Sequence, residues 1–424
     1  MNFFRVWASA LVLIGLSVGA GRVSALDARH PLRHSRTTEP HLTEPHRTAH
    51  HTAETATRRS AVAHAGRRGY SVARGGVRRV SYARSSRHHF YERFTASSFA
   101  KGDIFAGDIT AGEDPVVRQA AIDAMGDMNG TAVVIDPSNG RILAMVNQKL
   151  ALSPGAEPCS TIKLTVAMAA LSEGIVTSDT PVKLAGFRMN MTQALAKSNN
   201  LYFEEMGREL GFERVRHYAN QFGLGELAGY NIPGEQLGVY PDRELPASQG
   251  GVGRMCSFGQ GVSLTPLQLG AFVAALANGG TLYYLQHPTT PEEVAALQPK
   301  IKRTLDIAKY VPDMEDGMAG AVEYGTARRL RANFHELPVF GKTGTCSDNG
   351  TRFGWFAAYS DSPQGSLVTV FFLEGGRPTF GPRAAELTGE FYKNLWNRNW
   401  FASKGPQDAA AFPRVFPQPQ QNLP

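Results

Sequence analysis

The chain of 424 residues contains only three Cys, at positions 159, 256 and 346. An odd count leaves at least one thiol without a partner in the same chain. We expect all three to be small buried side chains, with a disulfide as the alternative. The chain also lacks a nucleotide-binding motif, and nine of its twelve His lie in residues 27–100 without metal-ligand spacing. The sequence therefore implies no cofactor and no metal.

Long hydrophobic runs are also scarce. The apolar stretch Val6 to Ala20 is about fifteen residues long, whereas a membrane-spanning helix needs about 20. Arg5 precedes this stretch, and the small residues Val23-Ser24-Ala25 follow it, which is the pattern of an export signal. We predict that residues 1–26 are a signal peptide, with an uncleaved signal anchor as the alternative. In either case the rest of the chain is periplasmic or otherwise extracytoplasmic.

Residues 27–100 have no Lys and few residues that form a core. They hold fourteen Arg against five acidic residues, a net charge of +9, while the whole chain carries +7. We predict a disordered linker that acts as a spacer, with adhesion to anionic wall polymer or lipid as the alternative. Nucleic acid is not expected behind an export signal. The chain from residue 101 on has a net charge of about −4. We assign residues 101–401 to a folded domain, and the Pro- and Gln-rich residues 402–424 to a disordered tail.

Hydrophobic periodicity and turn residues predict the elements of this domain. Strands are expected at both ends of the domain with helices between them, which indicates an α+β fold. The expected strands are 131–136, 141–147, one at Val339, 353–360 and 367–372. The expected helices are 114–125, 163–172, 192–197, 202–210, 213–222, 267–277, 312–330 and 383–396.

The most informative feature is Ser160-Thr161-Ile162-Lys163, at the start of an apolar helical stretch. Residues three apart lie on the same face of a helix, so the hydroxyl of Ser160 and the amine of Lys163 are expected to be neighbours. Serine is a weak nucleophile that needs a base, and a lysine can be that base if burial or a second cation lowers its pKa. Alone, such a pair is more often part of a solvated helix face.

Two further motifs follow in order. The first is Ser198-Asn199-Asn200, which by itself reads as a helix cap. The second is Lys342-Thr343-Gly344-Thr345, which by itself reads as an exposed edge strand. The ordered trio resembles the active-site signature of the penicillin-binding transpeptidases and serine β-lactamases. The resemblance covers most of residues 112–400 and includes these further matches: 129–137, 139–146, 232–235, 257–261, 265–269, 277–281, 317–318, 325–327 and 355–359.

The resemblance implies a five-stranded antiparallel sheet flanked by helices, an all-helical lobe and an active site between them. It also implies a D,D-transpeptidase that forms a serine acyl-enzyme with D-alanyl-D-alanine peptides during peptidoglycan cross-linking and that binds β-lactams. The implied roles are these: Ser160 is the nucleophile, Lys163 its base, Ser198 a proton relay, Asn200 a ligand of the substrate amide, and Lys342, Thr343 and Thr345 ligands of the terminal carboxylate. The backbone N–H groups of Ser160 and Thr345 would stabilise the oxyanion, and Gly344 would leave room for substrate along the strand.

Two other functions stay open. A D,D-carboxypeptidase or a class D-like β-lactamase uses the same scaffold, although class D enzymes carry an apolar residue where Asn200 stands. A non-catalytic β-lactam sensor or wall scaffold is the third hypothesis. It depends on Cys159, because the family usually has Gly before the nucleophile, and a larger side chain there could crowd Ser160. If the fold resembles the family, Cys159 and Cys346 both lie near the same cleft.

Overall fold

The computed structural model describes residues 94–403, and a five-stranded antiparallel sheet is its central element. The strand order is β2-β1-β9-β8-β7, so that β2 and β7 form the two edges. The strands are β1 (Gly130–Asp136), β2 (Arg141–Val146), β7 (Val339–Asp348), β8 (Thr351–Ser360) and β9 (Leu367–Gly375). The expected α+β class and the five-stranded sheet are confirmed.

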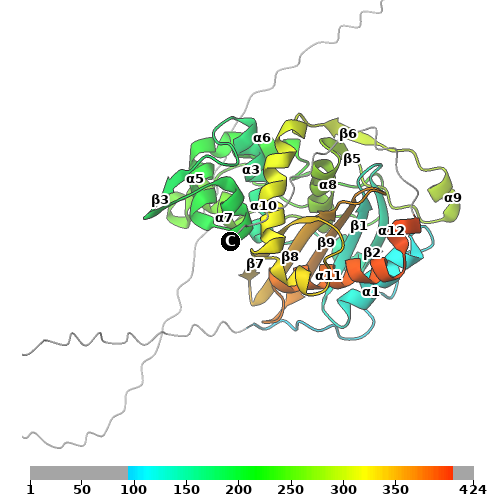
Figure 1. Ribbon diagram of the computed structural model, residues 1–424. Coiled ribbons are helices and arrows are strands. Elements are labelled where there is room, and N and C mark those ends of the chain that lie inside the picture. The colour runs from blue at the N-terminus through cyan, green and yellow to red at the C-terminus, as the bar shows by residue number, and fades with distance from the viewer. Residues whose placement is uncertain (1–93, 404–424) are drawn as a thin grey trace, which may run out of the picture. The chain divides into compact units, whose positions relative to one another are not determined.

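Helices cover both faces of the sheet (Figure 1). Alternation along β1 separates the two cores, since Ala132 and Val134 belong to one cluster and Val133 and Ile135 to the other. The first cluster packs the sheet against α1 (Pro115–Met125) and α11 (Gly381–Asn397), and the second packs it against α8 (Pro266–Ala277). Caps fix where two of these helices begin: the Asp114 side chain accepts from two N–H groups of α1, and Thr265 forms a capping box with Gln268 at α8.

A mainly helical lobe lies beside β7, the edge strand (Figure 1). Its helices are α3 (Lys163–Ser172), α4 (Met191–Lys197), α5 (Asn200–Leu210), α6 (Phe212–Gln221) and α7 (Gly251–Phe258), with α10 (Val311–Glu323) between this lobe and the sheet. The remaining elements are short: α2 (Gln148–Ala151), η1 (Cys159–Ile162), β3 (Val182–Leu184), β4 (Phe187–Met189), η2 (Ala247–Gln249), β5 (Thr281–Tyr283), α9 (Pro291–Ala295), β6 (Ile301–Thr304), η3 (Ala308–Tyr310), η4 (Arg328–Ala332) and α12 (Trp400–Ser403).

Two predictions about helices were incomplete. The expected helix 312–330 is α10 followed by a break and the separate turn η4. A Cβ at Gly325 would lie 2.1 Å from the Ala196 carbonyl oxygen, so the chain turns closely against α4 at this glycine. Helix α7 was not predicted, because Gly251 and Gly253 lower the helix propensity of its sequence.

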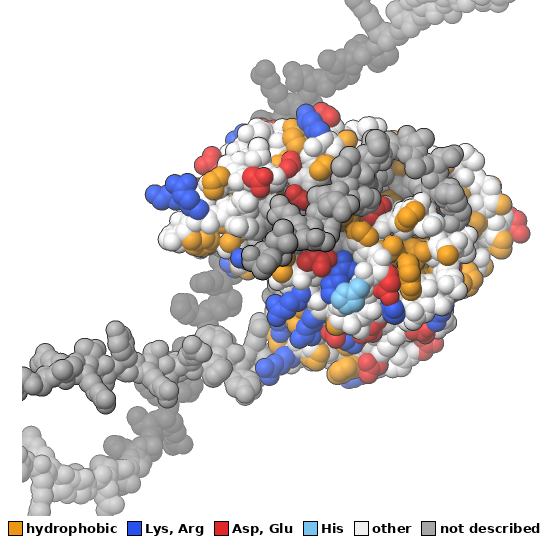
Figure 2. Space-filling model, in the orientation of Figure 1, with side chains coloured by type: hydrophobic (Ala, Val, Ile, Leu, Met, Phe, Trp, Pro, Cys, Tyr) orange, Lys and Arg blue, Asp and Glu red, His pale blue; other side chains and the backbone are white. Residues whose placement is uncertain are grey.

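The ends of the chain lie largely outside the described residues. The predicted signal at 1–26, most of the linker and nearly all of the tail 402–424 fall there. Within the described part, Ala100 donates a backbone hydrogen bond to Asp127, and Asn129 donates one to Ser98. The packed region therefore begins before residue 101. Among residues 94–403, no helix has both the length and the apolarity needed to cross a bilayer. Acidic, basic and hydrophobic side chains are interspersed on the face seen in Figure 2.

Candidate active site

Ser160 and Lys163 lie where the helical lobe meets the sheet. Ser160 is in the 3₁₀ turn η1, and Lys163 is the first residue of α3. The Lys163 Nζ lies 2.6 Å from the Ser160 Oγ, 2.8 Å from the Asn200 Oδ1 and 2.6 Å from the Ser257 carbonyl oxygen. The amide and carbonyl oxygens can only accept, so they take two N–H groups of the amine. In a neutral Lys163 the remaining lone pair would face the Ser160 hydroxyl.

The surroundings of Lys163 favour this neutral form. Its side chain is fully buried, and its Nζ lies 5.7 Å from the Phe203 ring centre and 5.8 Å from that of Phe258. Burial, helped by the charge of Lys342, holds the pKa of Lys163 well below its usual value, while Glu204 opposes the shift. Glu204 had no role in the sequence analysis. Glu204 lies near Lys163 because α5 packs beside α7. The hydroxyl of Ser257 in α7 lies 3.5 Å from the Glu204 carboxylate.

Ser198 lies on the opposite side of the site, next to the second lysine. The Lys342 Nζ donates to the Ser198 Oγ at 2.8 Å and to the Thr343 carbonyl oxygen at 3.0 Å. Ser198 ends α4 in the left-handed conformation, with φ 53°, and Asn199 caps the next helix through the Tyr202 N–H. Helices α4 and α5 thus meet at this motif. The Ser198 side chain is hydrogen-bonded to Lys342, and the Asn200 side chain is hydrogen-bonded to Lys163. Burial lowers the pKa of Lys342 to about 7.

The rest of the Lys-Thr-Gly motif lies along β7. The Thr343 Oγ1 is 2.6 Å from that of Thr326, and the Thr345 Oγ1 accepts from the Gly381 N–H at 2.8 Å. A Cβ at Gly344 would lie 2.8 Å from the Pro158 carbonyl oxygen. The glycine thus lets η1 pack closely against β7, which is a different reason from the expected room for substrate.

The prediction of buried thiols was wrong for two of the three cysteines. Cys159 and Cys346 form a disulfide between η1 and β7, with 5.5 Å between their Cα atoms. Cys159 has φ 51°, in the left-handed region that favours glycine. Its side chain is fully buried, directed into the cross-link. Cys256 is buried and free as expected, and burial raises the pKa of its thiol.

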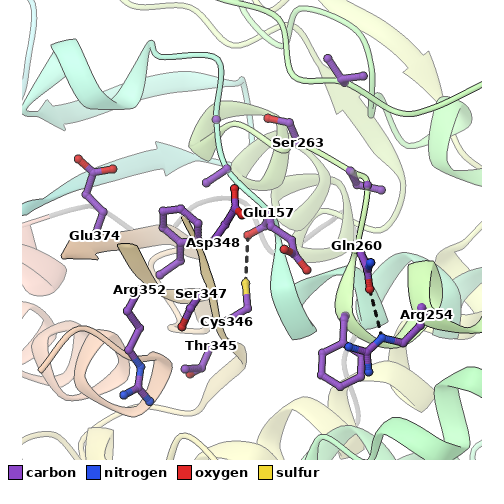
Figure 3. Close-up of a pocket in the computed structure, with 17 residues that line it drawn as sticks. Glu157, Arg254, Gln260, Ser263, Thr345, Cys346, Ser347, Asp348, Arg352 and Glu374 are labelled. Atoms are coloured by element: carbon purple, nitrogen blue, oxygen red, sulfur yellow. Dashed lines mark hydrogen bonds between the residues drawn. The ribbon is translucent and has the colours of Figure 1, made fainter. Parts of the chain in front are cut away.

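A cavity of about 970 Å³ opens beyond Thr345 at the end of β7 (Figure 3). Acidic and basic side chains line it together, namely Glu157, Arg254, Asp348, Arg352 and Glu374. Burial raises the pKa values of the Glu157 and Glu374 carboxyls. The Arg254 guanidinium stacks on Phe258, 3.7 Å from the ring centre, and donates to Gln260. The five charged side chains were not predicted, because they come from the loop before η1, from helix α7 and from the strands β7, β8 and β9, which only the fold brings together.

The low pKa of Lys342 predicts a pH-dependent stability. The folded chain loses this proton near pH 7, whereas an unfolded lysine keeps it to about 10.5. The unfolded state thus binds more protons between these values, so the free energy of unfolding should rise with pH across that window, by at most about 1.4 kcal/mol per pH unit from this group. Urea unfolding at pH 7 to 10 should give a flatter profile for Lys342→Met. The exposed Lys183→Met is the control, and a variant slope equal to the parent's would contradict the argument.

Comparison with known proteins agrees with this geometry. Residues 130–393 match the family model described as "Penicillin binding protein transpeptidase domain". Stage V sporulation protein D of Bacillus subtilis is 30% identical over 317 residues, which are 62% of this chain and 48% of that protein. Peptidoglycan D,D-transpeptidase MrdA of Acinetobacter baumannii is 25% identical over 66% of this chain and 52% of its own length.

A third relative has a more similar length. Peptidoglycan D,D-transpeptidase PbpA of Mycolicibacterium smegmatis is 27% identical over 69% of this chain and 72% of its own length. The chain spans about half the length of the first two relatives. The family match covers more than half of this chain and includes every residue of the three motifs. The resemblance seen in the sequence is confirmed, and the chain belongs to the penicillin-binding protein transpeptidase family.

Proposed function

We propose that this protein is a penicillin-binding D,D-transpeptidase that forms a serine acyl-enzyme with D-alanyl-D-alanine stem peptides and cross-links peptidoglycan. The contact that carries the proposal is the one between Lys163 and Ser160, in which a buried amine of lowered pKa lies 2.6 Å from a hydroxyl. A neutral amine in this position can take the proton of the attacking serine. Two of the relatives are named as D,D-transpeptidases, which supports the same reaction.

In the acylation step, the Ser160 Oγ bonds to the carbonyl carbon of the penultimate D-alanine while its proton passes to Lys163. The peptide C–N bond then breaks, and the terminal D-alanine leaves after its nitrogen gains a proton. Ser198 is assigned to relay that proton, and its hydroxyl accepts a hydrogen bond from Lys342. An acceptor amine attacks the ester next, which forms the cross-link and returns the proton to Ser160.

Binding and charge stabilisation fall to β7 and its neighbours. The backbone N–H groups of Ser160 and Thr345 are assigned to the oxyanion that develops on the attacked carbonyl. Thr343, Thr345 and Lys342 are assigned to the terminal carboxylate, and Asn200 to the substrate amide. Because β7 is an edge strand, an extended stem peptide can pair with it and continue toward the cavity beyond Thr345.

The alternatives differ in what happens after acylation. A D,D-carboxypeptidase or a class D-like β-lactamase passes the acyl group to water, whereas a non-catalytic sensor either keeps it or never forms it. Asn200 favours the transpeptidase over a class D enzyme, because its amide oxygen accepts from Lys163, which an apolar residue could not do.

One experiment separates these functions. The protein is labelled with fluorescent penicillin, and its intact mass is followed over hours. A stable adduct supports the transpeptidase or a sensor that keeps the acyl group, rapid loss of the adduct supports a β-lactamase, and no adduct supports a silent site. Incubation with a D-alanyl-D-alanine pentapeptide and an acceptor amine then shows whether D-alanine release is accompanied by a new peptide bond or by hydrolysis alone.

We also propose an extracytoplasmic location, with residues 1–26 as an export signal or anchor and the Arg-rich segment up to the domain as a linker. A chain that begins at Phe94 is expected to fold and to be acylated at the parental rate, because the three motifs lie beyond it. Stopped-flow acylation of both chains checks this, and failure of the shorter chain to fold would contradict the linker assignment.

If the linker also adheres to anionic surfaces, only the full chain should bind anionic vesicles. That binding should weaken steeply as salt rises, because exposed charges are screened within about 10 Å at 0.1 M salt. Replacing the fourteen Arg by Gln is the matched control. If the chain from Phe94 onward binds the anionic vesicles and this binding does not depend on salt, the linker does not cause adhesion and acts only as a spacer.

A further inference from the structure

The disulfide connects the two backbone segments, η1 and β7, that flank the proposed oxyanion site. Cys159 directly precedes Ser160, and Cys346 directly follows Thr345. The two amides assigned to the oxyanion are therefore each one residue away from a cross-linked cysteine. No other covalent bond connects η1 to β7 among residues 94–403, and the two segments are 187 residues apart in the chain.

The backbone at Cys159 explains what a cross-link there can do. Its φ of 51° is one that residues with a Cβ rarely adopt and that glycine adopts freely. Hydrogen bonds hold the segment on either side of Cys159: the Glu157 carbonyl accepts from the Trp355 Nε1 at 3.0 Å, and the Pro158 carbonyl accepts from the Thr161 N–H at 3.1 Å and from its hydroxyl at 2.6 Å. The Pro158–Thr161 bonds close a turn that contains Cys159 and Ser160, and the disulfide ties this same turn to β7.

We propose that the Cys159–Cys346 disulfide is a positioning element that takes the place of glycine. It holds a non-glycine residue in the left-handed conformation that directs the Ser160 N–H toward the oxyanion site. The inference rests on the proposed function, since it concerns the acylation of Ser160. Oxyanion donors act only when they are placed in advance, so a relaxed Cys159 should slow acylation more than it weakens penicillin binding.

Two variants separate the turn conformation from the cross-link. Cys346→Ser removes the bond and leaves a free Cys159, whereas Cys159→Gly with Cys346→Ser removes the bond but restores the residue that tolerates positive φ. Cys256→Ser, which removes the free buried thiol, is the control. Stopped-flow titration with benzylpenicillin gives the acylation rate constant and the dissociation constant separately, and thermal unfolding confirms that each variant is folded.

Cys346→Ser is expected to lower the acylation rate constant by about ten- to a hundredfold, as for the relief of one strained backbone residue, with a change of less than about threefold in the dissociation constant. The double variant should recover most of the rate although it lacks the cross-link. A parental rate for Cys346→Ser would overturn the proposal. A double variant as slow as Cys346→Ser would also overturn it, because the cross-link would then act by some route other than the turn.

Chemical reduction of the Cys159–Cys346 disulfide tests the proposal independently, without any substitution. Cys346 is only partly buried and lines the cavity, so a small dithiol can reach the bond. Dithiothreitol gives two electrons and two protons to form two thiols and becomes a cyclic disulfide itself. After the dithiothreitol is removed, the reduced parent should be acylated slowly by benzylpenicillin and should regain its acylation rate upon reoxidation. The acylation rate of the double variant should not change. A reduced parent in which Cys159 and Cys346 are free thiols but the acylation rate is unchanged would overturn the proposal. If the oxidised parent forms no adduct at all, the proposed function fails instead.

Discussion

Replacing Ser160 by Ala is expected to abolish the covalent penicillin adduct completely. The acyl bond needs a nucleophilic oxygen, and the Ser160 Oγ is the hydroxyl that lies 2.6 Å from the buried amine of Lys163. Cleavage by trypsin and reduction of the disulfide should place the adduct of the parent on the peptide Leu150–Lys163. The measurement is intact mass after treatment with excess penicillin, followed by peptide mapping.

That peptide contains a second serine, which provides a matched control. Ser153 is seven residues earlier and precedes η1. Ser153→Ala should keep the full adduct, and Ser160→Ala should have none while its unfolding temperature stays close to that of the parent. A full adduct on Ser160→Ala would show that another residue is acylated.

Local periodicity was enough to predict one half of this site. Ser160 and Lys163 are three residues apart, one in the 3₁₀ turn η1 and the other at the start of α3, and a helical turn of either kind places two such side chains on the same face. The five strands of the sheet were also predicted from alternation and turns, although β8 begins earlier than expected. The missed signal there is Asn349-Gly350, a two-residue hairpin turn with positive φ at both positions.

The other half needs tertiary structure. Ser198 and Lys342 are 144 residues apart, and only the resemblance to a known family connected them beforehand. The Ser257 carbonyl, which accepts from Lys163, comes from a glycine-rich helix that propensity does not predict. The disulfide was missed for a related reason. Composition gives the number of cysteines, but their pairing depends on how closely η1 packs against β7, which Gly344 permits.

These contacts also explain why one site carries two buried lysines. Burial disfavours charge on both lysines, and the charge of Lys342 further disfavours charge on Lys163. Asn200 and the Ser257 carbonyl occupy two N–H groups of Lys163, and Ser198 and the Thr343 carbonyl do the same for Lys342. Each amine is thus held by two fixed acceptors on the protein, and Lys163 has its third contact with the Ser160 hydroxyl.

Replacing Lys163 by Ala is therefore expected to lower the acylation rate constant by about 10²–10⁴-fold, the usual range for the loss of a general base. The rate of the parent should fall as pH falls, because acylation uses the neutral amine. Its lowered pKa moves this loss of rate to a lower pH than the usual value of 10.5 would give. The variant should lose this pH dependence, since no amine remains beside Ser160.

The measurement is the acylation rate constant and the dissociation constant of benzylpenicillin between pH 6 and 9. Lys163→Arg is a second variant, because a guanidinium keeps its proton at these pH values and should be as slow as alanine. Lys183→Ala, on the exposed β3, is the control and should match the parent. Removal of Lys163 leaves Asn200 and the Ser257 carbonyl without their donor, so unfolding must be measured alongside. A folded Lys163→Ala variant that loses less than about tenfold in rate across this range would assign the base to another group, with Lys342 and its relay Ser198 the next pair to test.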